Sequence, residues 1–229
     1  MLEELRAEVL EANLELVRRG LVIYTFGNAS AVSREHGLCV IKPSGVPYDK
    51  MTPADMVISD LDGRIVEGSL KPSTDLPTHV ALYKAFPTIG GIAHTHSRHA
   101  TAWAQAVCEI PCFGTTHADY FHGAIPVTEP LEPAEIEDEY EANTGVAIIQ
   151  RLQGIEPLSC PAILVAGHAP FCWGKTVAEA AYHAVIVEEL ALMAWQTMTI
   201  NPAAKPISQA LRDKHHFRKH GPKASYGQN

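Results

Sequence analysis

Short β-rich runs separated by turn residues fill much of the first third of this chain, and they are the feature that most constrains its fold. Pairs such as Gly27-Asn28 and Asp62-Gly63 punctuate these runs, and an Asp-Gly pair between two strands is typical of a tight hairpin. Helical stretches interrupt the runs irregularly, so repeated βαβ units are not expected. The pattern predicts a mixed or mostly antiparallel sheet with helices packed on both faces. The expected strands are residues 21–24, 29–33, 38–42, 57–60, 64–67, 89–93, 125–128 and the strand-like run 161–168.

Apolar residues at helical spacing predict the helices. Leu5, Val9 and Leu16 fall on one stripe, and Gly20 ends the pattern as a helix C-terminus often does. Thr176 is placed to cap a long and largely buried helix that runs to about residue 199. Residues 110–120 are expected to be irregular or extended. The remaining expected helices are residues 76–86, 98–107, 133–152 and one that begins near 208.

The composition excludes several classes of protein. Of the 229 residues, 46% are hydrophobic, which allows a sizeable core, and no linker divides the chain, so we expect a single domain spanning residues 1–229. The net charge of -8 argues against a nucleic-acid surface, which needs a basic face to neutralise phosphates. The acidic start of the chain does not resemble a secretory signal, and no run is apolar enough to span a bilayer. We therefore expect a cytoplasmic protein that binds neither nucleic acid nor membrane.

A His-x-His motif follows the strand expected at residues 89–93. Side chains two positions apart on a strand point to the same side, so His94 and His96 can reach one metal ion. The alternative is that one of these histidines is packed in the core and the other is solvated. The motif by itself leaves both interpretations open.

Two residues elsewhere in the chain could complete a metal site at this motif. His168 ends the run 161–168, and Asp75 lies at the expected start of a helix. Three neutral imidazoles with one carboxylate or water form a four-coordinate, zinc-type shell with an exchangeable position. Taken singly, His168 could instead bond to the backbone, and Asp75 could be an ordinary helix N-terminal charge. Their joint presence favours a metal site.

Three turns could bind a phosphate group. One turn lies just before the helix expected at 76–86, where unpaired N–H groups and the helix dipole attract anions. Two glycine-containing turns earlier in the chain could bring further N–H groups to the same anion, and a nearby lysine adds positive charge. Each feature taken alone is also ordinary turn chemistry. The absence of a Walker loop and of a Gly-x-Gly-x-x-Gly motif argues against nucleotide or nicotinamide binding. The candidate residues are Gly27, Asn28, Lys42, Ser44, Gly45, Ser73 and Thr74.

The chain also contains seven longer motifs. They are Gly-Asn-Ala-Ser at 27–30, Lys-Pro-Ser-Gly-Val at 42–46, Lys-Pro-Ser-Thr-Asp-Leu-Pro-Thr-His at 71–79, His-Thr-His-Ser at 94–97, Gly-Thr-Thr-His-Ala-Asp-Tyr-Phe at 114–121, Gly-His-Ala-Pro-Phe at 167–171 and Asp-Lys-His-His-Phe-Arg-Lys-His-Gly at 213–221. Together these motifs resemble the class II aldolase and epimerase family over nearly the whole chain. In the related aldolases a glutamate stands at the position that matches Asp75. The aspartate here, together with Ala118-Asp119-Tyr120 and the tail that contains Tyr226, resembles the epimerase branch of the family.

The resemblance implies a fold and an assembly. The fold would be a three-layer α/β/α sandwich, and the subunits would form a homotetramer with active sites between them. One zinc ion per subunit would be bound by His94, His96 and His168 together with Asp75. Residues 206–229 would be a C-terminal tail that completes the active site, and the seven turn residues named above would bind the phosphate.

The resemblance also implies catalytic groups and a reaction. Asp119 and Tyr226 would be the acid/base pair, supported by Thr115, Lys42 and His215. The substrate would be a small phosphorylated ketopentose, and L-ribulose 5-phosphate would become D-xylulose 5-phosphate through inversion at C4. The C3–C4 bond would break and re-form through an enediolate of dihydroxyacetone and glycolaldehyde phosphate, with zinc as the Lewis acid.

Other functions stay open at the level of sequence. An aldolase of the same family, acting on a related phosphorylated ketose, would release its aldehyde. A non-catalytic interaction protein with the same fold would bind no zinc, although the complete ligand set argues against it. Metal-dependent hydrolases that use His-x-His are a weaker alternative, because they usually need a longer barrel with the motif nearer its start.

Overall fold

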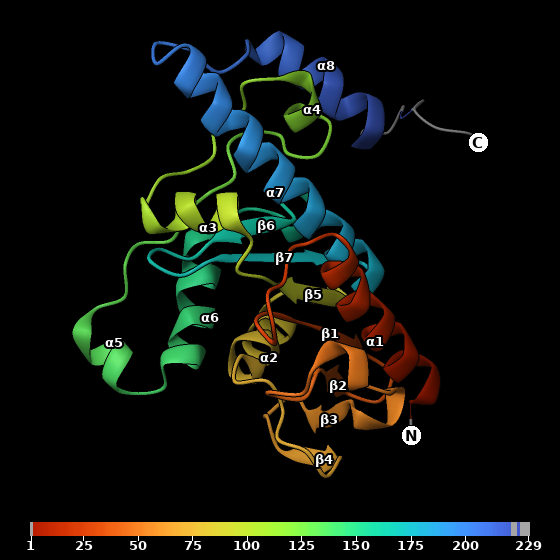
Figure 1. Ribbon diagram of the computed structural model, residues 1–229. Helices are drawn as coiled ribbons and strands as arrows, with labels where there is room; N and C mark the ends of the chain where they lie inside the picture. The colour runs from red at the N-terminus through yellow and green to blue at the C-terminus, as the bar shows by residue number, and fades with distance from the viewer. Residues whose placement is uncertain (1, 221–223, 225–229) are drawn as a thin grey trace.

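A seven-stranded sheet forms the centre of the protein (Figure 1). The computed structural model describes residues 2–220 and residue 224. The strands lie in the order β4-β3-β2-β1-β5-β7-β6, and each neighbouring pair is antiparallel. The sheet is therefore antiparallel rather than mixed, and one isolated parallel bridge joins Val127 to Leu164 beside it. The strands are β1 Asn28–Ser33, β2 Leu38–Ile41, β3 Val57–Asp60, β4 Ile65–Glu67, β5 Gly91–His94, β6 Ala162–Leu164 and β7 Pro170–Gly174.

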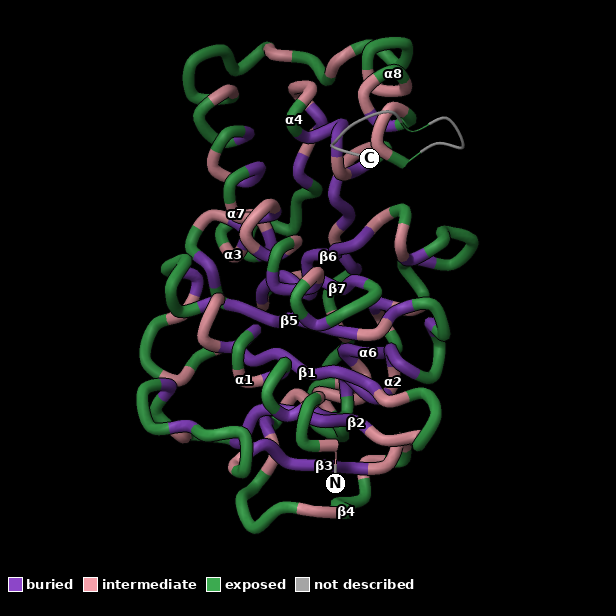
Figure 2. Tube along the Cα trace, turned by 90° about the vertical axis from the view of Figure 1, so that its right-hand side faces the viewer, coloured by how far each residue is buried: buried purple, intermediate pink, exposed green. Residues whose placement is uncertain are grey.

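Helices cover both faces of the sheet, as the sequence predicted. Figure 2 shows α1, α3 and α7 on one side of the strands and α2 and α6 on the other, which gives a three-layer α/β/α sandwich. The short helix α4 packs against α8 at the upper end of the molecule in Figure 1. The helices are α1 Glu3–Arg18, α2 Leu76–Ala85, α3 Arg98–Gln105, α4 Thr115–Ala118, α5 Pro133–Glu137, α6 Tyr140–Arg151, α7 Val177–Ile200 and α8 Gln209–His220, with single turns at Tyr48–Lys50, Pro53–Asp55 and Pro157–Ser159.

Alternation along the strands divides the core between the two faces. In β2, Val40 packs in the cluster beneath α1 and α7, whereas its neighbours Cys39 and Ile41 pack in the cluster beneath α2 and α6. The aromatic side chains of Phe171 and Trp173 in β7 join the second cluster and are fully buried. Complete burial of a large apolar side chain contributes about 1.5–3 kcal/mol. The sheet is thus anchored from both sides, and its strand ends hold fixed positions.

Two of the expected strands do not form. Residues 21–24 are irregular, because Tyr24 adopts a left-handed backbone conformation with φ 55° and its side chain is 86% exposed. Residues 125–128 make only isolated bridges, from Ile125 to Ile110 and from Val127 to Leu164. Residues 125–128 therefore bridge to two different segments and do not pair as a strand with either of them.

The helix expected at residues 133–152 is two helices, α5 and α6. Glu139 lies between them in a left-handed conformation, with φ 52°, which interrupts the helical path. The amide of Asn143 donates hydrogen bonds to the carbonyls of Glu135 at 2.9 Å and Asp138 at 2.7 Å. These bonds satisfy carbonyl groups that α5 leaves free at its end. The region 110–120, expected to be irregular, contains the single-turn helix α4.

The long helix α7 runs along one face of the sheet toward the upper end of the molecule (Figure 1). Thr176 caps it as predicted, since its Oγ1 accepts a hydrogen bond from the backbone N–H of Glu179 at 3.2 Å. Across the described part of the chain, none of the helices combines the length and the apolar character that a bilayer crossing needs. Glu188, in the middle of α7, turns its carboxylate toward the start of α3.

Candidate metal centre

Three histidine side chains meet at one end of the sheet. His94 is the last residue of β5, where it pairs with Asn28 of β1 on one side and with Phe171 of β7 on the other. His96 follows in the link to α3, and His168 lies in the connection between β6 and β7. Nε2 of His96 is 3.1 Å from Nε2 of His94 and 3.2 Å from Nε2 of His168. The structure therefore brings together the three histidines that the sequence singled out.

The outer nitrogens of two of these imidazoles are held by neighbouring groups. Nδ1 of His94 donates to the carbonyl of Pro170 at 3.0 Å, which leaves the lone pair on Nε2. The His94 ring also stacks on Phe171, with ring centroids 4.1 Å apart. Nδ1 of His168 lies 3.3 Å from the hydroxyl of Tyr140. Contacts of this kind orient metal-ligating imidazoles.

The spacing of the three imidazoles fits a tetrahedral metal ion. Nitrogen ligands at about 2.0–2.1 Å from zinc lie about 3.3–3.4 Å from one another on a tetrahedron. The observed separations of 3.1 and 3.2 Å are close to this value. Two nitrogen lone pairs repel each other at such a distance unless a proton or a cation lies between them. The donor set itself therefore fits a bound cation.

Burial keeps the imidazoles of His96 and His168 in the form that binds a metal. Burial, followed by the neighbouring imidazoles of His94 and His96, lowers the pKa of His168 to about 4. Burial and the proximity of His94 also lower the pKa of His96. A histidine must be neutral to bind a metal, so these two groups can ligate at neutral pH without first losing a proton.

Asp75 lies beside the three histidines but farther from them than they lie from one another. Its Oδ2 is 3.9 Å from Nε2 of His94 and accepts a hydrogen bond from Nδ2 of Asn28 at 2.6 Å. Burial acts to raise the pKa of Asp75, but the imidazoles of His94 and His79 outweigh it, so that pKa is lowered. The carboxylate thus brings a negative charge to the site. Its role as the fourth metal ligand stays a prediction.

The turn residues predicted for anion binding lie next to one another. Loops 42–45 and 71–74 are joined by a hydrogen bond from the backbone N–H of Ser73 to the carbonyl of Lys42 at 2.9 Å. Nδ2 of Asn28 donates to Oγ of Ser73 at 3.0 Å, which ties the first turn to the other two. The exposed members of the set are Ser44, Gly45 and Thr74.

Two buried polar groups in these loops have bonding capacity left for a ligand. The carbonyl Oδ1 of Asn28 is buried and has no hydrogen-bond partner within the described chain. An unsatisfied buried acceptor costs about 1–3 kcal/mol, which a ligand hydroxyl would offset. Lys42 is 2% exposed, and its ammonium contacts the carbonyls of Pro43 at 3.2 Å and Thr25 at 3.5 Å. Burial lowers the pKa of Lys42 to about 8.

Gly27 adopts a left-handed conformation, with φ 78°, against the carbonyl of His94. A Cβ at this position would lie 2.7 Å from that carbonyl oxygen. We therefore expect Gly27→Ala to lower the free energy of unfolding by at least about 1–2 kcal/mol, the strain of the left-handed conformation alone, and to displace the end of β5. Chemical denaturation measures the first effect and zinc affinity the second. Gly123→Ala is the matched control, because its Cβ meets open space, and equal losses in both variants would contradict this role for Gly27.

Asp119 lies in a different part of the molecule, between α4 and α8. Its Oδ2 accepts a hydrogen bond from Nη2 of Arg218 at 2.9 Å, and its Oδ1 accepts one from Nδ1 of His215 at 3.1 Å. Nζ of Lys219 lies 3.5 Å from the same carboxylate. Burial acts to raise the pKa of Asp119, but the bonds from Arg218 and His215 outweigh it and lower that pKa. The carboxylate is therefore anionic and held by α8.

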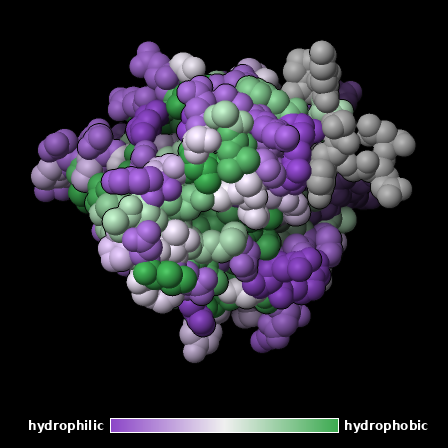
Figure 3. Space-filling model, turned by 90° about the horizontal axis from the view of Figure 1, so that it is seen from above, coloured by the Kyte–Doolittle hydropathy of each residue, from purple (hydrophilic) through white to green (hydrophobic). Residues whose placement is uncertain are grey.

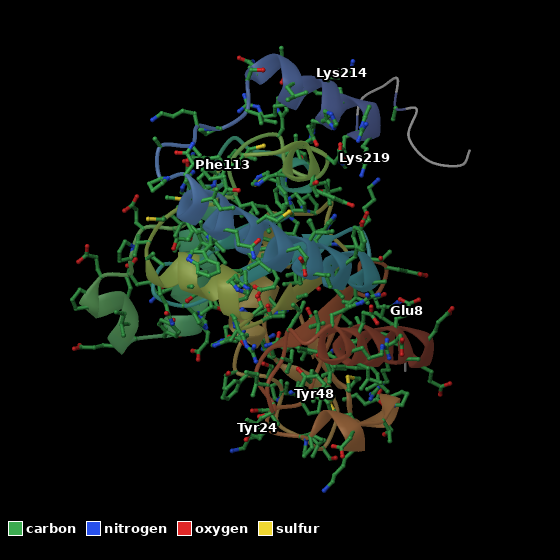
Figure 4. All side chains as sticks on the ribbon, turned by 45° about the horizontal axis from the view of Figure 1, so that its top comes forward. Glu8, Tyr24, Tyr48, Phe113, Lys214 and Lys219 are labelled. Carbon is green, nitrogen blue, oxygen red and sulfur yellow. The ribbon has the colours of Figure 1, made fainter. Side chains whose placement is uncertain are left out.

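A single chain does not bring all the predicted residues into one site. In Figure 4, Lys219 lies in the upper part of the molecule, whereas Tyr48, whose ring contacts the ammonium of Lys42, lies in the lower part. Thr115 begins α4 and belongs with Asp119 in the upper cluster. Tyr226 lies outside the described residues, so its predicted role stays a prediction.

Some residues of the site carried no recognisable signal in the sequence. Tyr140 approaches His168 from α6, and Phe26 approaches His96 with ring centroids 6.1 Å apart. Neither residue belongs to a spacing pattern with the histidine that it contacts. Arg218 had a partial signal, since it belongs to a basic tail motif next to the predicted supporting residues.

The sequence profile of the class II aldolase and adducin N-terminal domain matches residues 7–195. The chain belongs to this family. The matched segment contains the three histidines, Asp75 and all three loops predicted to bind an anion, whereas α8 lies beyond it.

Full-length relatives extend the comparison to the tail. The L-ribulose-5-phosphate 4-epimerase UlaF of Salmonella paratyphi C is 54% identical over 227 residues, which cover 99% of this chain and 100% of that protein. The protein of the same name from Salmonella typhi matches to the same extent. Among solved structures, an L-fuculose 1-phosphate aldolase superimposes with a TM-score of 0.81 at 22% identity, covering 95% of this chain and 96% of that one. The L-fuculose-1-phosphate aldolase of Thermus thermophilus gives 0.68 at 23% identity, covering 89% and 98%. At these identities the two solved structures support the fold alone.

Proposed function

We propose that this protein interconverts L-ribulose 5-phosphate and D-xylulose 5-phosphate by inverting C4. The observation that carries the proposal is the convergence of His94, His96 and His168 in a chain that is 54% identical, over its full length, to relatives named for this reaction. The donor set supports one zinc ion per subunit, because three imidazoles with a nearby carboxylate suit zinc. Asp75 is the proposed fourth ligand.

The substrate's own chemistry favours cleavage of a carbon–carbon bond. The C2 carbonyl makes the C3 proton acidic, but it does not activate the C4 proton, so simple deprotonation cannot invert C4. Oxidation and re-reduction at C4 would need a redox cofactor, and the chain carries no dinucleotide fingerprint. Retro-aldol cleavage between C3 and C4, rotation of the aldehyde and re-addition to its other face invert C4 without net redox chemistry.

The residues of the chain divide this task between them. Zinc held by the histidines would supply Lewis-acid stabilisation of the negative charge that develops during cleavage. Asn28 accepts a hydrogen bond from a substrate hydroxyl through its unpartnered Oδ1, because its amide hydrogens already bond to Ser73 and Asp75. Asp119 and Tyr226 transfer protons at the C4 oxygen on opposite faces of the aldehyde, which is why two separate groups are needed.

The three loops beside the histidines hold the phosphate group. Gly27, Ser44, Gly45, Ser73 and Thr74 belong to loops that hydrogen bonds keep together. Lys42 supplies the positive charge from a buried position, where its attraction for an anion is stronger than in water. A phosphate held in these loops fixes which end of the substrate faces the metal.

The pKa of Lys42 predicts a pH dependence of substrate binding. Below about pH 8 the buried amine is protonated and attracts the phosphate, and above it the charge is lost, so KM should rise as pH increases through about 8. Lys42→Met removes a charge-assisted hydrogen bond of about 1.5–3 kcal/mol and should raise KM about 10- to 150-fold at pH 7. Steady-state kinetics between pH 6.5 and 9.5 tests both effects. A variant that keeps the KM profile of the wild type would contradict the role of Lys42.

We further propose a homotetramer with active sites between subunits. Within one chain, Asp119 lies in the upper cluster with α8, away from the histidines, so a neighbouring subunit is the natural source of the acid/base group. Apolar side chains gather near the centre of the face seen from above in Figure 3. On α7, Trp195 is 54% exposed and Ile200 85% exposed, and a groove of about 650 Å³ lies between α3 and α7. These surfaces support contacts between subunits.

Product analysis tests the proposed activity. The zinc-loaded protein should convert L-ribulose 5-phosphate into D-xylulose 5-phosphate until the two reach equilibrium. Free dihydroxyacetone as the main product would instead indicate an aldolase acting on a related phosphorylated ketose. No conversion of either kind would exclude both activities for this substrate.

A further inference from the structure

We propose that Glu188 is a positioning residue that holds His96 in place for metal binding. Glu188 lies on α7, far along the chain from the histidines, but its side chain reaches the start of α3. Oε1 accepts hydrogen bonds from the backbone N–H of His99 at 3.0 Å and from Nδ1 of His99 at 2.7 Å. Oε2 accepts one from the backbone N–H of Ala100 at 3.0 Å. The inference rests on the metal site of the proposed function.

This carboxylate takes the place of a helix cap for α3. Ser97 precedes the helix but makes no side-chain hydrogen bond to it. The first N–H groups of a helix have no partner inside the helix, and Glu188 satisfies those of His99 and Ala100. Its negative charge also lies at the positive end of the helix dipole. The side chain is 13% exposed, so these bonds are largely shielded from water.

The bonds from Glu188 to the start of α3 matter more for the position of His96 than for the positions of His94 and His168. His94 is bonded through Nδ1 to a backbone carbonyl, and Nδ1 of His168 contacts the hydroxyl of Tyr140. In the described part of the chain, Nδ1 of His96 has no hydrogen-bond partner. His96 is nevertheless the central member of the group, since its Nε2 lies within 3.2 Å of both others. Apart from the ring contact with Phe26, its placement therefore depends on its backbone.

The backbone of His96 is fixed from two sides. The link that carries it begins at the end of β5, where His94 is paired with strands on both sides. The link ends at Arg98, the first residue of α3, whose start Glu188 holds. Only three residues separate these two anchors, so a displacement of α3 moves His96 directly. Loss of the Glu188 bonds should therefore loosen one ligand while leaving the other two in place.

The test compares the zinc affinities of full-length variants. Glu188→Gln keeps the shape of the side chain but replaces one acceptor oxygen by an NH₂ group that faces N–H donors. Loss of groups that orient metal ligands commonly lowers metal affinity about 10- to 100-fold, and we expect a loss of this size. Competition with a chromophoric chelator measures the zinc affinity, at a temperature well below that at which the protein unfolds. Glu189→Gln is the matched control, because Glu189 is exposed on the same helix, and it should bind zinc within about twofold of the wild type.

A second control separates positioning from general stability. Arg34 donates hydrogen bonds to three carbonyls, those of Tyr83 and Phe86 at the end of α2 and that of Ile89 in the link to β5. Arg34→Gln should lower the free energy of unfolding and leave zinc affinity within about twofold of the wild type. If Glu188→Gln also leaves zinc affinity within twofold, or if Arg34→Gln lowers it equally, the proposal is overturned.

A milder variant keeps the test valid if Glu188→Gln does not fold. His99→Ala removes the Nδ1 bond but preserves the two backbone N–H bonds to the carboxylate, so zinc affinity should fall by less than in Glu188→Gln. Unchanged affinity in His99→Ala, with no folded Glu188→Gln to compare, would overturn the proposal. A wild-type protein that binds zinc but does not act on L-ribulose 5-phosphate would refute the proposed function while leaving this test in force.

Discussion

Removal of the metal is expected to abolish turnover of L-ribulose 5-phosphate. Lewis-acid stabilisation of the cleavage step is worth several kcal/mol, which corresponds to at least about a thousand-fold in rate. Dialysis against a chelator should therefore leave less than about a thousandth of the activity, and added zinc should restore it. His96→Ala should give a loss of similar size without chelation, because it removes the central nitrogen of the group.

The control for this prediction is a histidine outside the site. His36 is exposed in the turn between β1 and β2 and contacts only Oγ of Ser33 among the described side chains. His36→Ala should keep wild-type activity and zinc content. Full activity in protein shown by metal analysis to lack zinc and other divalent metals would contradict the proposed mechanism.

Asp119→Asn is expected to lower turnover about 10²- to 10⁴-fold, the usual contribution of a well-placed acid or base. Asparagine keeps the shape of the side chain and can still accept a hydrogen bond from Arg218, but it cannot take up a proton. Asp213→Asn is the control, because Asp213 is another carboxylate of this cluster and bonds to His122 at 2.6 Å. Steady-state rates near those of the wild type for Asp119→Asn would contradict its role as acid or base.

Mixed oligomers test whether Asp119 acts across a subunit interface. Subunits that carry His96→Ala and subunits that carry Asp119→Asn should each be almost inactive alone. Co-expressed in one oligomer, some sites would combine an intact histidine group from one chain with an intact Asp119 from its neighbour. We expect such oligomers to regain a substantial fraction of activity. Mixed oligomers that stay as inactive as the single variants would place Asp119 and the histidines of a functional site in the same chain.

The histidine group could be predicted from the sequence, and so could the turns proposed to bind the phosphate, because local rules position them. His94 ends β5, and Asp75 immediately precedes a helix whose start is marked by turn residues and a proline. The run expected to end at His168 is shorter than predicted, because β6 ends at Leu164 and His168 lies in the turn that leads into β7. Pairing of β5 with β7 then brings His94 and His168 to the same end of the sheet. The positive φ of Gly27 likewise follows from its place in a turn.

The surroundings of these residues could not be predicted in the same way, because they depend on contacts between distant segments. Glu188 reaches α3 across 89 positions of the chain, and Arg218 reaches Asp119 across 99. Neither pair has a spacing pattern that periodicity could detect. The strand expected at residues 21–24 failed for a related reason, since β propensity does not indicate the left-handed conformation of Tyr24.

The central claim is that this chain inverts C4 by breaking and re-forming the C3–C4 bond at the histidine group. L-Ribulose 5-phosphate that carries deuterium at C4 tests it most directly, when the zinc-loaded protein acts on it in ordinary water and NMR follows the product. We expect D-xylulose 5-phosphate that retains deuterium at C4, because the bond between C4 and its hydrogen is never broken in a retro-aldol route. Product that has exchanged this deuterium for solvent hydrogen, or no product at all, would contradict it.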